Sequence, residues 1–278
     1  MSLVEIENLR ITFPSDTGPV QAVRGVSLSL GRERLGIVGE SGSGKSLTGR
    51  ALMGVLPEHA RLDVDRMEFD GIDLTRAGPR QRRRLRGGRM GMILQDPKFS
   101  LNPVMRVGAQ IVESIRIGDR SLSRAAARAR ALETLEAVHI RAPDRVFDLY
   151  PHELSGGMGQ RVMIAMMVVR QPDLLIADEP TSALDVTVQE QVMSILDDAV
   201  RSRGMGLVLI SHDLHLVSRF CDRVVIMYSG RIVETLPAAN LAGAVHPYTR
   251  GLLACLPDID GTAARLPVLN RDPAWAQA

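Results

Sequence analysis

The sequence predicts an α/β fold with a mostly parallel sheet and flanking helices. Short apolar segments alternate with amphipathic ones along most of the chain, as in folds whose parallel strands are joined by helices. Several of these apolar segments end in a glycine or a polar residue, as strands do where they reach a ligand-binding edge. The chain has 278 residues, 45% of them hydrophobic, which is enough for one large domain or two modest ones.

The first third of the chain is expected to be rich in strands. Residues 3–13 and 22–30 alternate apolar and polar residues and are separated by the turn-rich segment PSDTGP, residues 14–19. Residues 34–40 form a short apolar strand that contains Gly39, and residues 41–56 then have helical periodicity. The apolar residues expected on one face of that helix are Leu47, Ala51, Leu52 and Val55.

The middle of the chain is expected to hold an inserted helical subdomain. Another apolar strand ends at Gln95, and strand patterns are absent between Gln95 and Ser155. Residues 107–117 and 123–140 have helical periodicity, and Ser123 is suited to the N-cap of the second helix. The alternation then resumes, with strands at 173–179, 206–213, 224–230 and 231–236, helices at 186–203 and after 213, and one helix-like segment at 248–256.

Charge and composition argue against nucleic acid as a partner. The net charge is only +2 with a pI of about 8.8. Residues 80–89, RQRRRLRGGR, contain many arginines but no aromatic residues. We therefore expect a solvated surface turn there and not a nucleic-acid patch.

The cellular setting is indicated by three further features. Cys221 and Cys255 lack C-x-x-C spacing, which fits a reducing compartment and neither a disulfide framework nor a metal site. The N-terminus MSLVEIENLR does not resemble a signal peptide. The apolar run 162–169 is far shorter than the roughly 20 residues that span a bilayer. We expect a soluble protein, which is still able to dock on a membrane protein.

The segment GESGSGKS, residues 39–46, fits the phosphate-binding pattern G-x-x-x-x-G-K-[ST] between a strand and a helix. Small residues let successive backbone N–H groups point at phosphate oxygens, and the helix N-terminus adds its positive dipole. Lys45 would reach the β- and γ-phosphates, and the Ser46 hydroxyl would bind Mg²⁺. A coincidental glycine turn is the alternative, and the flanking strand and helix argue against it.

Polar residues follow three other apolar strands. Asp178 and Glu179 end the segment DLLIADE, where Asp178 would hold Mg²⁺ through water and Glu179 would act on the water that attacks the γ-phosphate. Gln95 and His212 each end an apolar strand as well. Either of them alone is more simply a satisfied polar strand end. The carboxyl ends of parallel strands gather on one edge of a sheet. Gly39 and the four polar residues named here therefore form one candidate site.

The order and spacing of these motifs resemble the ATP-binding cassette (ABC) ATPases, from about residue 3 to residue 256. The resemblance implies a P-loop NTPase core with an N-terminal antiparallel β subdomain and an inserted helical subdomain. In this family LSGG, residues 154–157 here, binds the ATP of a second subunit in a head-to-tail dimer. SALD at 182–185 matches the D-loop, Gln95 the Q-loop and His212 the switch histidine.

The resemblance implies a role for each matching residue. ATP and Mg²⁺ are the expected cofactors. The catalytic residues implied are Lys45, Gln95, Glu179 and His212, and the Mg²⁺ ligands are Ser46, Gln95 and Asp178. The residues implied to bind ATP, with Phe13 stacking on adenine, are Phe13, Gly39, Glu40, Ser41, Gly42, Ser43, Gly44, Lys45, Ser46, Leu47, Gln95, Asp178, Ser155, Gly156, Gly157 and Asp185.

Within the family the chain is similar to ATPase subunits of importers for peptides and nickel or metal chelates. HPYT at 246–249 is the most discriminating segment for this subfamily. The resemblance implies two membrane-spanning permease subunits and a second ATPase subunit as partners. For the second ATPase, a paralogue is favoured over an identical copy. An extracytoplasmic solute-binding protein would be an indirect partner. The chain would then lie peripherally on the cytoplasmic face of the inner membrane. The resemblance also implies three parts of the chain: a nucleotide-binding core at 1–95 and 160–236, a helical subdomain at 96–159 and a C-terminal extension at 237–278.

Three features depart from the family pattern. Met158 and Gly159 follow LSGG where glutamine is usual, and Lys98-Phe99 differ from many peptide-importer relatives. The chain ends without a cysteine-rich segment, so we expect no iron–sulfur cluster.

Alternative functions are an ATPase of a soluble complex of the carbon–phosphorus lyase type, a DNA-repair cassette ATPase and a small-molecule kinase. The absence of heptads and metal ligands before LSGG argues against a DNA-repair cassette ATPase. The presence of LSGG and SALD argues against a small-molecule kinase.

Overall fold

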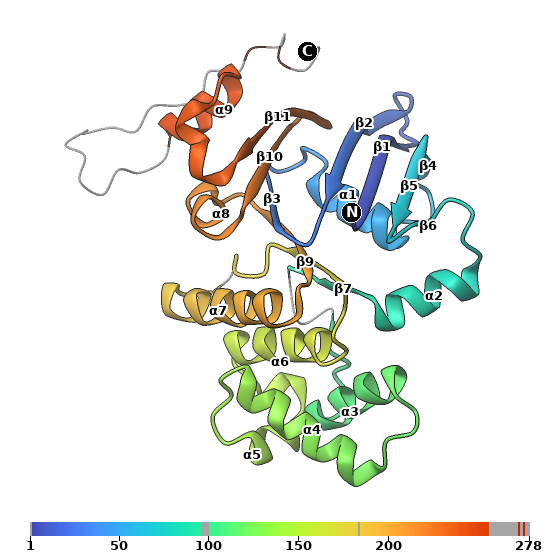
Figure 1. Cartoon of the computed structure of the whole chain (residues 1–278), viewed down its shortest axis with the longest axis vertical. Helices are drawn as coiled ribbons and strands as arrows, with labels where there is room; N and C mark the ends of the chain where they lie inside the picture. Colours follow the sequence, from blue (N-terminus) through green and yellow to red (C-terminus); the bar gives the residue numbers. More distant parts are fainter. Residues whose placement is uncertain (1, 96–99, 183, 256–271, 273–274, 276–278) are drawn as a thin grey trace, which may run out of the picture. The chain divides into compact units, whose positions relative to one another are not determined.

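The computed structural model describes residues 2–95, 100–182, 184–255, 272 and 275. The chain divides into two compact units, Met1–Ala77 with Val208–Ala278, and Gly78–Leu207. Figure 1 labels their helices and strands, and each unit is described by itself. No helix among the described residues is long and apolar enough to span a membrane.

The first unit contains a five-stranded antiparallel sheet in the order β2-β1-β5-β6, with β4 also paired to β1. The long strands β1 (Val4–Phe13) and β2 (Val20–Leu30) were predicted. Their inward residues, among them Leu9 and Ile11, are fully buried, as the alternating pattern requires. The three short strands β4 (Arg61–Asp63), β5 (Arg66–Phe69) and β6 (Ile72–Asp73) were not predicted.

A second group of strands in this unit leads into the predicted phosphate-binding segment, residues 39–46. Strand β3 (Arg34–Val38) runs parallel to β10 (Arg223–Tyr228), which forms an antiparallel hairpin with β11 (Arg231–Pro237). Both β3 and β10 are almost wholly buried, which explains their continuous apolar sequence. The other elements of the unit are α1 (Lys45–Met53), α8 (Leu214–Phe220), η3 (Ala238–Gly243) and α9 (Pro247–Ala254).

The second unit joins a parallel strand pair to a set of helices. Strands β7 (Met90–Ile93) and β8 (Leu174–Asp178) pair in parallel. Strand β9 (Gly206–Ser211) begins in this unit and continues into the first. The helices are α2 (Pro79–Gly88), α3 (Val107–Gly118), α4 (Arg124–Ala137), α5 (Pro143–Phe147), η2 (Pro151–Glu153), α6 (Gly156–Val168) and α7 (Val186–Arg203).

The helices of the second unit pack tightly against one another. Helix α3 contacts α4, α5 and α6. A Cβ atom on Gly108 of α3 would lie 2.2 Å from the Phe147 ring of α5, so only glycine fits there. The Ser123 side chain accepts a hydrogen bond from Ala126 N at 3.2 Å, which confirms the predicted N-cap of α4.

Three local predictions were wrong. The arginine-rich segment forms helix α2 and not the expected surface turn. Pro79 lies at the start of this helix, where proline is favoured, and only Leu85 is buried. A helix with one buried side chain shows no apolar period in its sequence. Helix α1 ends before Val55, since Gly54 caps it with φ 62° and leaves Val55 47% exposed. Gln95 lies beyond β7, whose pairing with β8 stops at Ile93.

The two cysteines lie in different surroundings, and this gives a testable difference in reactivity. Burial raises the pKa of the Cys221 thiol to about 12, whereas Cys255 is partly exposed. Since the thiolate is the reactive form, we expect iodoacetamide at pH 8 to label Cys221 at least about 100-fold more slowly than Cys255. Mass spectrometry of digested protein measures both rates, and both should become equal in denaturant. Equal rates in the folded chain would contradict this description of the core.

Candidate functional site

The predicted phosphate-binding segment forms the loop between β3 and α1. Gly44 is the N-cap of α1 with φ 97°, a left-handed conformation that favours glycine. A Cβ on Gly39 would lie 2.1 Å from the Met227 carbonyl oxygen, so the start of the loop also requires glycine. Helix α1 has no acidic residue in its first turn. The loop therefore presents a helix N-terminus suited to an anion.

The Lys45 side chain is folded back over this loop. It is 6% exposed, and its Nζ donates to Gly39 O at 2.6 Å, Glu40 O at 2.8 Å and Ser43 Oγ at 3.5 Å. These oxygen acceptors hold the buried ammonium in place over the loop. Lys45 is thus placed to meet a negatively charged group at the loop.

Neighbouring segments of the same unit fix the loop from outside. Gly230 N, in the turn after β10, donates to Ser43 O at 3.1 Å. Glu40 N donates to the Tyr248 hydroxyl of α9 at 3.1 Å. The predicted site residues did not include Tyr248, although the segment HPYT had been identified.

Two other predicted residues of the first unit lie at strand ends, and a third lies in α1. His212 is exposed and follows β9 directly, and the next residue, Asp213, caps α8 by accepting from Leu216 N at 3.0 Å. Phe13 ends β1 half-buried, with its ring centroid 5.6 Å from that of His59. Leu47 is half-buried in α1. An exposed imidazole and a partly exposed aromatic ring are both accessible to a ligand.

In the second unit the structure brings two predicted catalytic residues into contact. Asp178 is the buried last residue of β8, and Glu179 follows it with φ 48°. Gln95 Nε2 donates to Glu179 Oε2 at 3.0 Å. A left-handed conformation at a non-glycine residue is uncommon and is found disproportionately at functional sites.

The LSGG segment forms the N-terminus of α6. The Ser155 side chain caps the helix by accepting from Met158 N at 3.3 Å, and Ser155 and Gly156 are exposed. A Cβ on Gly157 would lie 2.9 Å from Val188 of α7, so the second glycine also serves packing within the chain. The exposed end of α6 has no acidic residue in its first turn. It is a second helix N-terminus suited to an anion.

Gln160 of this helix and Asp185 before α7 have structural roles that the sequence did not suggest. The buried Gln160 Nε2 donates to Pro180 O at 2.6 Å, and so ties α6 to the segment after Glu179. Asp185 caps α7 by accepting from Val188 N at 3.0 Å. Ala183 of the predicted D-loop and the departures at Lys98 and Phe99 lie outside the described residues.

The chemistry of the predicted Mg²⁺ ligands fits a metal shared with phosphate. The described residues contain no group of three or more His, Cys, Asp or Glu side chains that could hold a metal ion. The predicted set Ser46, Gln95 and Asp178 has one carboxylate. Mg²⁺ in phosphate-transfer sites is held by few protein ligands together with substrate phosphates. The set therefore fits Mg²⁺ only when a nucleotide supplies further oxygens.

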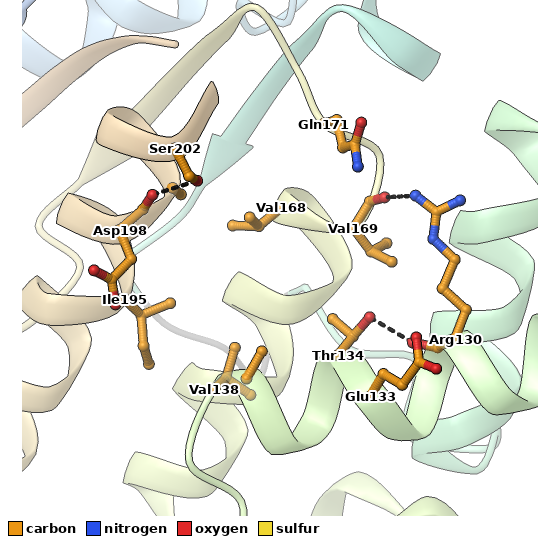
Figure 2. Close-up of a pocket in the computed structure, with 12 residues that line it drawn as sticks. Arg130, Glu133, Thr134, Val138, Val168, Val169, Gln171, Ile195, Asp198 and Ser202 are labelled. Carbon is orange, nitrogen blue, oxygen red and sulfur yellow. Dashed lines mark hydrogen bonds between the residues drawn. The ribbon is translucent and has the colours of Figure 1, made fainter. Parts of the chain in front are cut away.

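A cavity of about 550 Å³ in the second unit is a separate feature (Figure 2). It is lined by residues of α4, the end of α6 and α7. Its polar groups bond within the chain: Arg130 Nη2 donates to Val169 O at 2.8 Å and Thr134 Oγ1 donates to Arg130 O at 2.6 Å. None of the predicted site residues lines it. The cavity is therefore not the proposed nucleotide site.

Comparison with known proteins gives consistent matches. Residues 23–182 match the family model described as ABC transporter. The dipeptide transport ATP-binding protein DppD of Escherichia coli is 44% identical over 268 residues, which is 96% of this chain and 82% of DppD. The oligopeptide transport ATP-binding protein OppD of Bacillus subtilis is 44% identical over 263 residues, 94% of this chain and 73% of OppD.

Solved structures show the same similarity. A dimeric post-hydrolysis state of the ATP-binding cassette MJ0796, bound to ADP and Pi, has a TM-score of 0.76 and 26% identity over 84% of this chain and 98% of that one. The cbiO1 protein of Clostridium perfringens, part of the transporter complex cbiONQ, has a TM-score of 0.73 and 25% identity over 87% of this chain and 91% of that one. The predicted α/β fold is confirmed.

Proposed function

The chain belongs to the ABC transporter family, and we propose that it is the ATP-hydrolysing subunit that drives a peptide importer. The observation that carries this proposal is the buried Lys45 held over a glycine loop at a helix N-terminus, in a chain whose relatives are peptide transport ATPases. The relatives DppD and OppD are named as ATP-binding proteins of dipeptide and oligopeptide transport. This favours peptides over nickel chelates and over a soluble complex of the lyase type.

We propose that the first unit binds the phosphates of ATP. Lys45 exchanges its contacts with loop carbonyls for the β- and γ-phosphate oxygens, and the N–H groups of residues 41–46 bind the same oxygens. Phe13 stacks on adenine through its exposed face. Mg²⁺, when bound, neutralises charge on the phosphates, and Ser46, Gln95 and Asp178 would hold it.

Hydrolysis is assigned to Glu179 and the residues beside it. Glu179 accepts a proton from the attacking water at a carboxylate oxygen, which makes the water a better nucleophile. The side-chain amide of Gln95 donates to Glu179 Oε2 and thereby orients the carboxylate, while the side-chain oxygen of Gln95 would be a ligand for Mg²⁺. His212 stabilises the charge that develops on the γ-phosphate.

The second helix N-terminus completes the site of a partner. Ser155 and Gly156 are exposed at the start of α6, and the related cassette MJ0796 forms dimers. We propose that Ser155 and the N–H groups of Gly156 and Gly157 bind the γ-phosphate held by a second ATPase subunit. That subunit is a paralogue, and both dock on two permease subunits at the cytoplasmic face of the membrane, with a solute-binding protein delivering peptide from outside.

Replacing Lys45 with alanine tests the nucleotide site. We expect ATP affinity to fall by about 10- to 100-fold, because a charge-assisted contact to phosphate is lost. Titration of the purified chain with a fluorescent ATP analogue measures this. Arg50→Ala is the matched control, since it removes the same charge from the far end of α1. If both variants bind ATP like the wild type, the assignment of the loop is wrong.

A further inference from the structure

Tyr248 is held rigidly behind the phosphate-binding loop. It is fully buried, its ring centroid lies 4.5 Å from that of Tyr228, and Trp275 lies 6.1 Å from both rings. The start of α9 is fixed as well: His246 Nδ1 accepts from Tyr248 N at 3.2 Å. Glu234 Oε1 accepts from Val245 N at 2.7 Å and from His246 N at 3.3 Å. The Tyr248 hydroxyl therefore has little freedom to move.

This hydroxyl holds one particular peptide of the loop. Glu40 N donates to Tyr248 Oη at 3.1 Å, and the carbonyl of the same peptide, Gly39 O, accepts from Lys45 Nζ at 2.6 Å. A trans peptide is planar, so its N–H and C=O point in opposite directions. Tyr248 thus holds the N–H side of this peptide, and the Lys45 ammonium binds the carbonyl on its opposite side.

The same peptide cannot move aside easily. A Cβ on Gly39 would meet the Met227 carbonyl oxygen at 2.1 Å, which shows how closely the loop lies against the end of β10. If the peptide turned about its axis, Gly39 O would leave Lys45 and Glu40 N–H would lose its acceptor. The orientation of this peptide and the position of the ammonium are therefore coupled through the hydrogen bond from Lys45 Nζ to Gly39 O, which is one of the contacts that hold Lys45.

We propose that Tyr248 is a positioning residue for Lys45, so that the C-terminal HPYT segment sets the affinity of the loop for ATP phosphates. This inference rests on the proposed nucleotide site. It gives the segment a role in ATP binding that its distance in sequence from residues 39–46 does not suggest. The simpler alternative is that Tyr248 only fills the core, in which case its hydroxyl would contribute nothing to ATP binding.

Tyr248→Phe separates these two roles, because it keeps the ring and removes the hydroxyl. We expect ATP to bind about two- to tenfold more weakly, the effect of losing one hydrogen bond. The emission of Trp275, the only tryptophan, should stay unchanged and show that the ring cluster is intact. Tyr228→Phe is the matched control and should bind ATP like the wild type. Unchanged affinity in Tyr248→Phe would overturn the inference.

A double-mutant cycle tests whether Tyr248 acts through Lys45. In a Lys45→Ala background, Tyr248→Phe should cause no further loss of ATP affinity, whereas independent effects would multiply. Multiplying effects would overturn the positioning role. Failure of the wild type to bind ATP would instead refute the proposed function itself.

Hydrogen exchange on the unmodified chain gives an independent check. The Glu40 amide should be protected in the wild type, because its N–H is bonded to a buried hydroxyl. Free exchange at Glu40 would overturn the hydrogen bond on which the inference rests, whether or not the Tyr248 variant folds.

Discussion

ATP turnover by the assembled transporter should fall by about 10²- to 10³-fold when Glu179 is replaced by glutamine, while ATP binding is retained. The glutamine side chain has nearly the same shape, and its amide oxygen can still accept from Gln95 Nε2, which lies 3.0 Å from Glu179 Oε2. It cannot accept the proton of the attacking water. The loss should therefore appear in kcat and not in nucleotide affinity.

Phosphate release by the complex and equilibrium ATP binding by the same preparation measure the two effects. Glu190→Gln makes the same change at an exposed position of α7 and serves as the control. Turnover by Glu179→Gln close to that of the control would remove Glu179 from the role of general base.

Ser155→Arg should reduce turnover by the assembled complex by about 10²-fold and leave ATP binding by the isolated chain unchanged. Ser155 is exposed at the N-terminus of α6, where a long cationic side chain would occupy the space of the partner's γ-phosphate. In the proposed dimer this phosphate belongs to the ATP of another subunit, so ATP binding by the lone chain should not be affected.

The control for this variant is Ser123→Arg. Ser123 is also an exposed serine that caps a helix of the same unit. Both substitutions remove a helix cap worth about 1 kcal/mol of folding stability. Turnover by Ser155→Arg should therefore fall well below turnover by Ser123→Arg. Weakened ATP binding by the isolated Ser155→Arg chain would mean that Ser155 acts on the ATP of its own subunit.

Local patterns in the sequence predicted the elements that carry the site. The loop at 39–46 lies between a strand and a helix as expected, Asp178 ends a buried strand, and α7 has the predicted bounds. These features follow from hydrophobic periodicity and cap residues, which act over a few neighbouring positions. These elements can therefore be predicted from the sequence alone.

The individual contacts between distant residues were not predicted, although Gln95 and Glu179 were expected in one candidate site. The contact of Gln95 with Glu179 joins residues 84 positions apart, and that of Glu40 with Tyr248 joins residues 208 apart. The second glycine of LSGG was assigned to phosphate binding alone, yet Val188 of α7 also requires it. Only the packed structure shows these partners.

Helix α2 was missed for a different reason. Five arginines and a single buried residue, Leu85, leave almost no apolar period to detect. Pro79 at the start of the helix was the one signal that could have indicated it, since proline favours the first helical turn.

The most direct test of the central claim is peptide-stimulated ATP hydrolysis by the whole transporter. This chain is purified with its permeases and partner ATPase, reconstituted in lipid vesicles, and given the solute-binding protein with or without a dipeptide or oligopeptide. We predict Mg²⁺-dependent phosphate release that rises severalfold with peptide and not with a nickel chelate. Phosphate release that peptide leaves unchanged would contradict the assignment of this chain to a peptide importer.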